Sequence, residues 1–217
     1  LLFVVAMVAV YRLGVFIRVP GVDPIAIEQL RESAGQQGAL GFLNLFSGGA
    51  FESFSIFALG IMPYITASII MQVLGVVIPK LEELQSEGAV GQRKITQYTR
   101  YVTIGLATLQ ATGLVFIFGT GRGTAFFSAA SAAPTVPLLP DGVWPRGYLI
   151  IPTLVAGTAV LMWMAELISQ RGIGNGMSMI IFASVVASLP GGFWSILQLN
   201  GPFWFTAMVL LTIGIII

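Results

Sequence analysis

Long stretches without a charged side chain constrain this sequence more than any other feature. Charges are absent from residues 53–79, 101–121, 147–165 and 172–217. A helix needs about 20 mostly apolar residues to cross the hydrocarbon core of a bilayer, so each of the first three windows fits one helix and the last fits two. Backbone polar groups cannot remain unpaired in lipid, and the alternation typical of barrel strands is not seen, so these spans are expected to be helices.

The sequence therefore predicts an all-α, polytopic membrane protein. Turn sequences at residues 190–192 and 200–202 divide the last window, and residues 1–18 add an apolar run at the beginning. The expected spans are residues 1–18, 54–78, 101–119, 148–167, 173–189 and 203–217. Because the sequence begins and ends inside apolar runs, we expect it to be the N-terminal portion of a longer chain.

The distribution of basic residues predicts which connections face the cytoplasm. The connections at residues 79–100 and 168–176 are short and rich in basic residues, whereas those at residues 19–53 and 120–147 are longer and poorer in them. The basic residues of the first pair are Lys80, Arg93, Lys94, Arg100 and Arg171. By the positive-inside rule the denser side is cytoplasmic, which places the N-terminus there as well.

Composition excludes several classes of function. Only 9% of the residues are charged and 56% are hydrophobic. A soluble domain of this size could not cover its water-exposed surface with so few charged side chains. Histidine and cysteine are both missing, which removes Ser-His-Asp catalysis, Cys/His zinc sites and haem ligation by these residues. The net charge of +1 does not favour nucleic-acid binding. We expect no enzymatic activity, no cofactor and no metal site.

A short apolar segment, at about residues 40–53, precedes the second span. Its apolar part covers about 11 residues, which is too short to cross a bilayer. Gly48 and Gly49 provide a hinge within it. The segment is either a re-entrant half-helix or a helix lying flat on the outer surface.

Inside the second span, Gly60 and Pro63 are expected to loosen or kink the helix. Below them, Ile65, Ile69 and Gln72 have the spacing i, i+4, i+7 and share one helix face. This stripe can be a helix-packing surface in which Gln72 makes an interhelical hydrogen bond. The spacing alone favours that interpretation, but the stripe can also line a pathway, because a constriction of aliphatic side chains blocks ions by dewetting.

The glycine-rich run at residues 171–176 reads as a tight turn between two helices. It lacks the G-x-x-x-x-G-K pattern and no strand precedes it, so it does not indicate a phosphate site. The complete interior spans also lack ionisable residues at their centres, which argues against a proton relay. Arg12 and Glu166 lie towards the ends of their spans, where snorkelling or pairing in a loop accounts for them.

Four sequence strings, in this order and spacing, closely resemble the SecY family, the channel subunits of the bacterial Sec translocon. They are YRLGVFIRVPGVD at residues 11–23, NLFSGGA at 44–50 with SIFALGIMPYI at 55–65, RKITQYTRY at 93–101, and RGIGNG at 171–176. The resemblance implies a ten-helix inverted-repeat channel. This sequence would supply the first five transmembrane helices, a short plug half-helix and the start of a sixth transmembrane helix.

The resemblance also implies roles for individual residues. The plug that seals the outer funnel would comprise Phe42, Leu43, Asn44, Leu45, Phe46, Ser47, Gly48, Gly49 and Ala50. The second span, with Pro63, Ser68 and Gln72, would form one side of a lateral gate. Ile65, Ile69 and Ile181 would belong to the pore constriction.

Such a channel would pass unfolded secretory polypeptides across the bacterial plasma membrane and release signal sequences and membrane helices sideways into lipid. The implied partners are SecE, SecG, the SecA motor ATPase, the ribosome, signal sequences and nascent polypeptides. The cytoplasmic loop with Arg93, Lys94 and Arg100 would touch partners or act only as an orientation anchor.

Two other function classes, a secondary transporter and a membrane enzyme, are alternatives to a channel. A secondary transporter would need a polar site at mid-membrane, and the spans offer only Gln72 with scattered serine and threonine. A membrane enzyme would have to rely on Glu52, Glu166 and the tyrosines.

Overall fold

The computed structural model describes residues 2–22, 27, 46–51, 53–119, 147–172 and 174–188. Its labelled helices are α1 (Leu2–Val15), α4 (Met62–Val77), α5 (Pro79–Ser86), α6 (Ala89–Gly119) and α8 (Gly147–Arg171). A further apolar helix covers Gly176–Ser188. Over these ranges, extended pairing is limited to one isolated antiparallel bridge between Arg18 and Ser55. The all-α fold expected from the sequence is therefore confirmed.

The described helices include several of a length and composition suited to a membrane. Val90–Ile117 and Gly147–Arg171 are each long and apolar enough to cross one, and α4 with α5 makes a third candidate if this bent pair is one span. Leu2–Val15 and Gly176–Ser188 are shorter apolar helices. The expected sixth span at 203–217 and most of the two expected outer loops lie outside the described residues.

The expected cytoplasmic loop at 79–100 is largely helical. Ile78 is extended (φ −100°, ψ 113°) because the following Pro79 disfavours a helical conformation there, and the chain bends by 100° between α4 and α5. Pro79 then starts α5, which consists mostly of good helix formers. Gly88, at φ +69°, separates α5 from α6, which begins at Ala89 and so extends the third span well into the expected loop.

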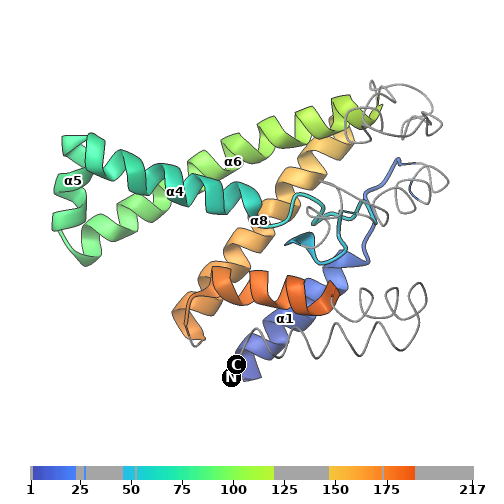
Figure 1. Ribbon diagram of the computed structural model, residues 1–217, viewed down its shortest axis with the longest axis horizontal. Helices are drawn as coiled ribbons and strands as arrows, with labels where there is room; N and C mark the ends of the chain where they lie inside the picture. The colour runs from blue at the N-terminus through green and yellow to red at the C-terminus, as the bar shows by residue number, and fades with distance from the viewer. Residues whose placement is uncertain are drawn as a thin grey trace, which may run out of the picture.

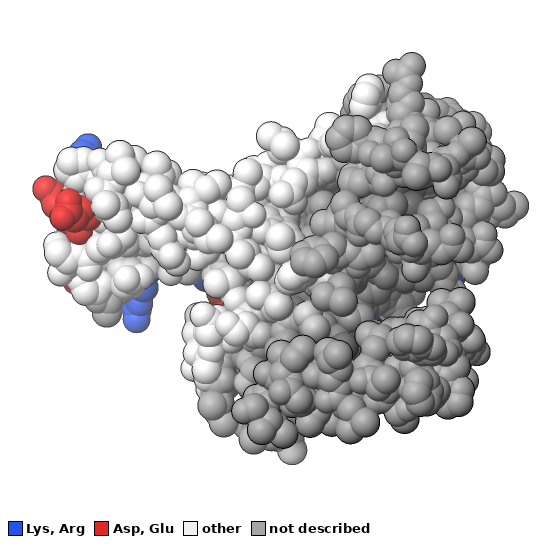
Figure 2. Space-filling view, viewed as in Figure 1, with Lys and Arg blue, Asp and Glu red and all other residues white. Residues whose placement is uncertain are grey.

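Helices α4, α5 and α6 form an arm that projects from the rest of the described helices (Figure 1). Helix α8 lies between this arm and α1, and packs against both α6 and α1. Charged side chains gather at the far end of the arm, around α5 (Figure 2). There Glu82, Glu83 and Glu87 are exposed, and Lys94 of α6 lies 3.8 Å from Glu87.

Residues 50–61, which precede α4, contribute to two hydrophobic clusters. Phe51, Phe54 and Ala58 pack with residues of α6 and α8 in the first cluster. Ala50, Phe57 and Ile61 pack with α1, α8 and the Gly176–Ser188 helix in the second. The core is thus built around a stretch that is not helical.

Two helix glycines make room for this stretch. A Cβ atom on Gly14 of α1 would collide with the ring of Phe57, and one on Gly157 of α8 would collide with the backbone carbonyl of Ile56. Small residues allow backbones to approach closely where membrane helices pack. The two glycines therefore fix how deeply the stretch lies between α1 and α8.

Candidate functional site at the turn segment before helix α4

We call residues 46–61, of which residue 52 is outside the description, the turn segment. Phe46 and Ser47 are helical, and successive turns then lead to α4. Gly48 (φ +63°) and Gly49 (φ +87°) adopt left-handed conformations that glycine accepts at little cost. The hinge that the sequence predicts at these glycines is therefore a reversal of the chain.

Helix α4 begins later than the expected second span. Residues 54–61 form turns, and Gly60 (φ +60°) is left-handed just before the helix. Pro63 lies in the first turn of α4 rather than inside a longer helix. Proline is favourable there, because its fixed φ suits the helix and its missing N–H would have no helical partner. Gly60 and Pro63 thus start the helix and do not kink it.

The turn segment satisfies its buried backbone groups through its own turns and through the residues that follow α1. The backbone N–H of Val19 donates to the Phe54 carbonyl at 3.1 Å, and that of Ile56 donates to the Ile17 carbonyl at 3.0 Å. The Phe51 N–H donates to the Ser47 hydroxyl at 3.0 Å. Irregular backbone at membrane depth is tolerated only where protein or a water-filled cavity surrounds it, and this segment meets that condition.

The described part of the predicted plug, residues 46–50, is attached to α1. The Tyr11 hydroxyl donates to the Ser47 carbonyl at 2.9 Å, and Arg12 donates to the Gly48 carbonyl at 2.8 Å. Ser47 is 4% exposed and Ala50 is completely buried. Phe42, Leu43, Asn44 and Leu45, the other predicted plug residues, lie outside the described residues.

Two of the three predicted constriction residues pack on the same side of the structure. Ile65 of α4 and Ile181 of the Gly176–Ser188 helix are partly buried and both pack against the second hydrophobic cluster. Ile69 lies one turn further along α4 and is 55% exposed. Ile65 and Ile181 therefore lie beside the seat of the turn segment, while Ile69 faces away from the described core.

The predicted gate residues lie on two sides of α4. Pro63 is buried, whereas Ser68 and Gln72 line a cavity of about 220 Å³ between α4, α5 and α6. Gln85, Gln92 and Thr96 also line this cavity, so Gln72 faces a polar, uncharged space.

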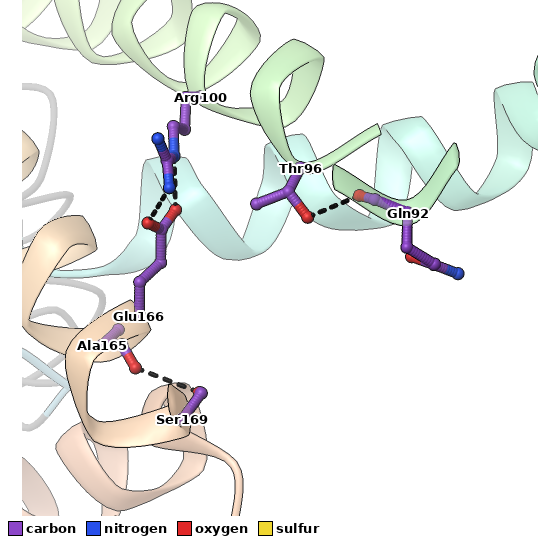
Figure 3. A network of polar contacts seen from close by, with 6 residues as sticks. All are labelled: Gln92, Thr96, Arg100, Ala165, Glu166 and Ser169. Carbon is purple, nitrogen blue, oxygen red and sulfur yellow. Dashed lines mark hydrogen bonds and ion pairs between the residues drawn. The ribbon is translucent and has the colours of Figure 1, made fainter. Parts of the chain in front are cut away.

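The three basic residues predicted for the loop have different surroundings. Arg93 and Lys94 are exposed near the tip of the arm. Arg100 instead forms a two-pronged ion pair with Glu166 of α8, in which its Nε donates to Oε1 at 2.7 Å and its Nη2 contacts Oε2 (Figure 3). The Glu166 side chain is only 11% exposed. Arg100 therefore joins the arm to α8.

This ion pair is not among the sequence-based predictions, although the sequence contains a signal for it. Arg100 stands immediately before the uncharged window 101–121, and Glu166 immediately after the window 147–165. In neighbouring antiparallel spans these two positions lie at the same end, which brings opposite charges together. Tyr11 and Ser184, by contrast, are 173 positions apart in the chain, and no local pattern links them.

Acidic side chains do not gather into a metal-binding group of three or more within the described ranges. What the site offers is a seat of apolar side chains, hydroxyls and backbone carbonyls for the turn segment.

Comparison with known proteins gives consistent matches. A family model described as SecY matches residues 55–217. The chain is 50% identical to the protein translocase subunit SecY of Streptomyces galbus over 197 residues, which is 90% of this chain and 44% of that protein. It is 43% identical to the subunit of the same name from Micrococcus luteus, over 99% of this chain and 47% of that protein. Identity to the Mycobacterium bovis subunit is also 43%, over 100% of this chain and 48% of the relative. The chain spans about half the length of the curated relatives it matches.

Proposed function

This chain belongs to the SecY family, whose members are helical, polytopic membrane proteins, and we propose that it forms the first half of a protein-conducting channel. The complete channel would have ten helices in two inverted halves. It would pass unfolded secretory polypeptides across the bacterial plasma membrane and release signal sequences and membrane helices sideways into lipid. The chain would act as a conduit, without catalysis or a cofactor.

The observation that carries this proposal is the buried, mostly non-helical turn segment at the centre of an otherwise helical core. Most of its residues are buried among α1, α6, α8 and the Gly176–Ser188 helix. In this proposal residues 42–50 form the plug, and the rest of the turn segment connects the plug to α4. A seat assembled from separate elements can release the plug without unfolding any one of them.

Ile65, Ile69 and Ile181 are proposed to form this half's part of the pore constriction. Aliphatic side chains offer no group that coordinates an ion, and a narrow apolar passage excludes water when it is empty. The packing of Ile65 and Ile181 on one cluster supports this role, as does the outward-facing Ile69, whose exposed surface remains available to the other half of a channel.

Helix α4 is proposed as one side of the lateral gate. Its exposed side chains Val73, Val76 and Val77 are apolar, with 58%, 80% and 70% of their surface exposed. An apolar face of this kind suits contact with lipid, with a signal sequence or with a facing helix. Pro63 and Gly60 mark the point where this helix joins the turn segment.

SecE, SecG, the SecA motor and the ribosome are proposed as partners, with the N-terminus and the tip of the arm in the cytoplasm. The exposed Arg93 and Lys94 near that tip are the residues proposed for contact with cytoplasmic partners. Arg100 is assigned to the ion pair with Glu166 instead.

The test uses the full-length subunit in its purified complex, reconstituted into planar bilayers. Ile65→Asn and Ile69→Asn each place an amide in the proposed constriction, and we expect a several-fold rise in resting ion conductance. Ile65→Leu and Ile69→Leu are the matched controls, because they keep an aliphatic collar. Wild-type conductance in both asparagine variants, in complexes that still translocate a secretory substrate, would contradict the constriction.

A further inference from the structure

Two buried hydroxyl groups, those of Tyr11 and Ser184, lie next to each other beside the start of the turn segment. The Tyr11 hydroxyl of α1 lies 2.9 Å from the Ser47 carbonyl and 2.8 Å from the Ser184 hydroxyl. Ser184 is 1% exposed and also lies 2.8 Å from the Ile180 carbonyl of its own helix. Three elements far apart in the chain thus meet at one small polar group inside an apolar core.

Counting protons shows that these contacts cannot all be hydrogen bonds at once. Each hydroxyl has one proton to donate. In the first arrangement Tyr11 donates to the Ser47 carbonyl, and Ser184 donates either to Tyr11 or to the Ile180 carbonyl. In the second, Tyr11 donates to Ser184 and Ser184 donates to the Ile180 carbonyl. The first arrangement holds the turn segment, and the second does not involve it.

We propose that Tyr11 and Ser184 form a hydroxyl latch that positions the start of the turn segment and keeps the plug seated at rest. When the Ser47 carbonyl withdraws, the two protons rotate into the second arrangement and both hydroxyls keep an acceptor. The Ser47 carbonyl in turn keeps the N–H of Ala50, which lies at 3.2 Å. Release therefore leaves neither latch hydroxyl without an acceptor, and a buried donor without a partner is the main cost of breaking a buried hydrogen bond.

The packing around Gly48 supports this role. A Cβ atom at Gly48 would lie 3.1 Å from the Tyr11 hydroxyl and 3.1 Å from the Ser184 Cα. The glycine thus lets the chain pass close to both latch residues. The ring of Tyr11 also stacks on the ring of Phe57, with the centroids 5.8 Å apart. This stacking fixes the position of the ring and therefore of its hydroxyl group.

This inference rests on the proposed function, because release of the latch would open the channel only if the segment that it holds is a plug. Tyr11→Phe removes the hydroxyl and keeps the stacked ring. In the full-length complex it should raise resting conductance about two- to tenfold, the effect of losing one hydrogen bond on the closed state. Ser184→Ala should leave resting conductance at or below the wild-type value, since Tyr11 keeps its closed-state acceptor and loses the one that it needs after release.

The two variants separate a latch from simple packing. Equal increases in conductance for Tyr11→Phe and Ser184→Ala would show that the pair only fills space, and unchanged conductance in Tyr11→Phe would show that it does not hold the plug. Polypeptide translocation is measured in the same preparations. Translocation by the wild type together with a silent Tyr11→Phe overturns the latch alone, whereas a wild-type complex that neither translocates nor conducts overturns the proposed function.

A reversible cross-link gives a second, independent test. A Cβ atom at Gly48 would lie 3.4 Å from the Ser184 Cβ, close to the separation of about 3.5–4.5 Å found in disulfides. In the Gly48→Cys, Ser184→Cys double variant, oxidation should stop translocation and reduction should restore it. Because a side chain at Gly48 (φ +63°) itself strains the seat, the comparison is between the oxidised and reduced forms of the same double variant, with the two single-cysteine variants as controls. Normal translocation after complete cross-linking would show that the turn segment need not leave this seat.

Discussion

The turn segment and the arm differ in opposite ways in backbone regularity and in burial. The turn segment is irregular, yet it is enclosed: Ala50 and Ser55 are fully buried, and its hydrogen bonds run to its own turns, to α1 and to the residues that follow α1. The arm is regular, yet it is open: Val76 of α4 and Leu109 of α6 are 80% and 70% exposed. The described chain thus supplies packing and hydrogen-bond partners for the turn segment, whereas the apolar faces of the arm are left exposed and suit contact with lipid or with another protein. Substitutions should therefore be felt strongly at the seat of the turn segment and weakly on the arm.

The largest effect is expected where the turn segment lies closest to a helix. Gly157→Ala places a Cβ atom against the Ile56 backbone carbonyl, which cannot move without displacing the core. Overpacking costs about 1–3 kcal/mol and occasionally more, and because the colliding atom belongs to the backbone we expect a loss of about 3 kcal/mol and a strongly destabilised complex. Thermal aggregation of the detergent-solubilised full-length complex measures this effect.

Gly105→Ala is the matched control on the arm. Nothing lies within 4 Å of a Cβ atom at Gly105. Alanine is also the better helix former, by up to about 1 kcal/mol, so this variant should be as stable as the wild type or more stable. Equal damage from both glycine substitutions would remove the distinction between an enclosed seat and an open arm.

The second largest effect is expected where the two regions are joined. Arg100→Ala leaves the Glu166 carboxylate, which is only 11% exposed, without its guanidinium partner. Hydrogen bonds to charged groups contribute about 1.5–3 kcal/mol, and we expect a loss in that range. The double variant with Glu166→Gln should lose less than the sum of the single variants, because both remove the same interaction.

Lys94→Ala supplies the comparison for this ion pair. Lys94 and Glu87 have side chains that are 54% and 49% exposed at a separation of 3.8 Å, and such surface pairs contribute about 0–1 kcal/mol. Chemical denaturation monitored by tryptophan fluorescence would rank the variants. A loss from Lys94→Ala as large as that from Arg100→Ala would show that the tip of the arm, and not its junction with α8, holds the arm in place.

The same contrast explains how far the sequence could predict this structure. The spans are predictable because the uncharged windows have the length of a helix, and α8 at Gly147–Arg171 lies close to the expected 148–167. The start of α4 was not predictable from composition, since residues 54–61 are as apolar as the helix that follows. What separates them is the left-handed backbone at Phe54 and Gly60, which tertiary packing imposes.

The candidate site was predictable only in part, for a related reason. Helical spacing places Ile65 and Ile69 on one face, but it does not say which of them packs inward; the structure buries part of Ile65 and exposes Ile69. The link between Tyr11 and Ser184 joins residues 173 positions apart, so only the assembled fold reveals it. The helical conformation of α5 could not be predicted, because a charged segment next to a membrane span is as typical of a loop as of an exposed helix.

The smallest effect is expected on the open face of α4, and a matched pair of valines tests it. Val115→Ser replaces a side chain that is 2% exposed in the core between α6 and α8, and should cost about 2 kcal/mol or more. Val76→Ser makes the same change at a side chain that is 80% exposed, and should cost less than about 0.5 kcal/mol. The midpoint of denaturation of the full-length complex is the measurement.

A gate helix has to separate from the helix or lipid that it contacts, so its contacts must be weak. If Val76→Ser were as damaging as Val115→Ser, this face of α4 would be a permanent interface, and a helix locked in that way could not serve as a lateral gate.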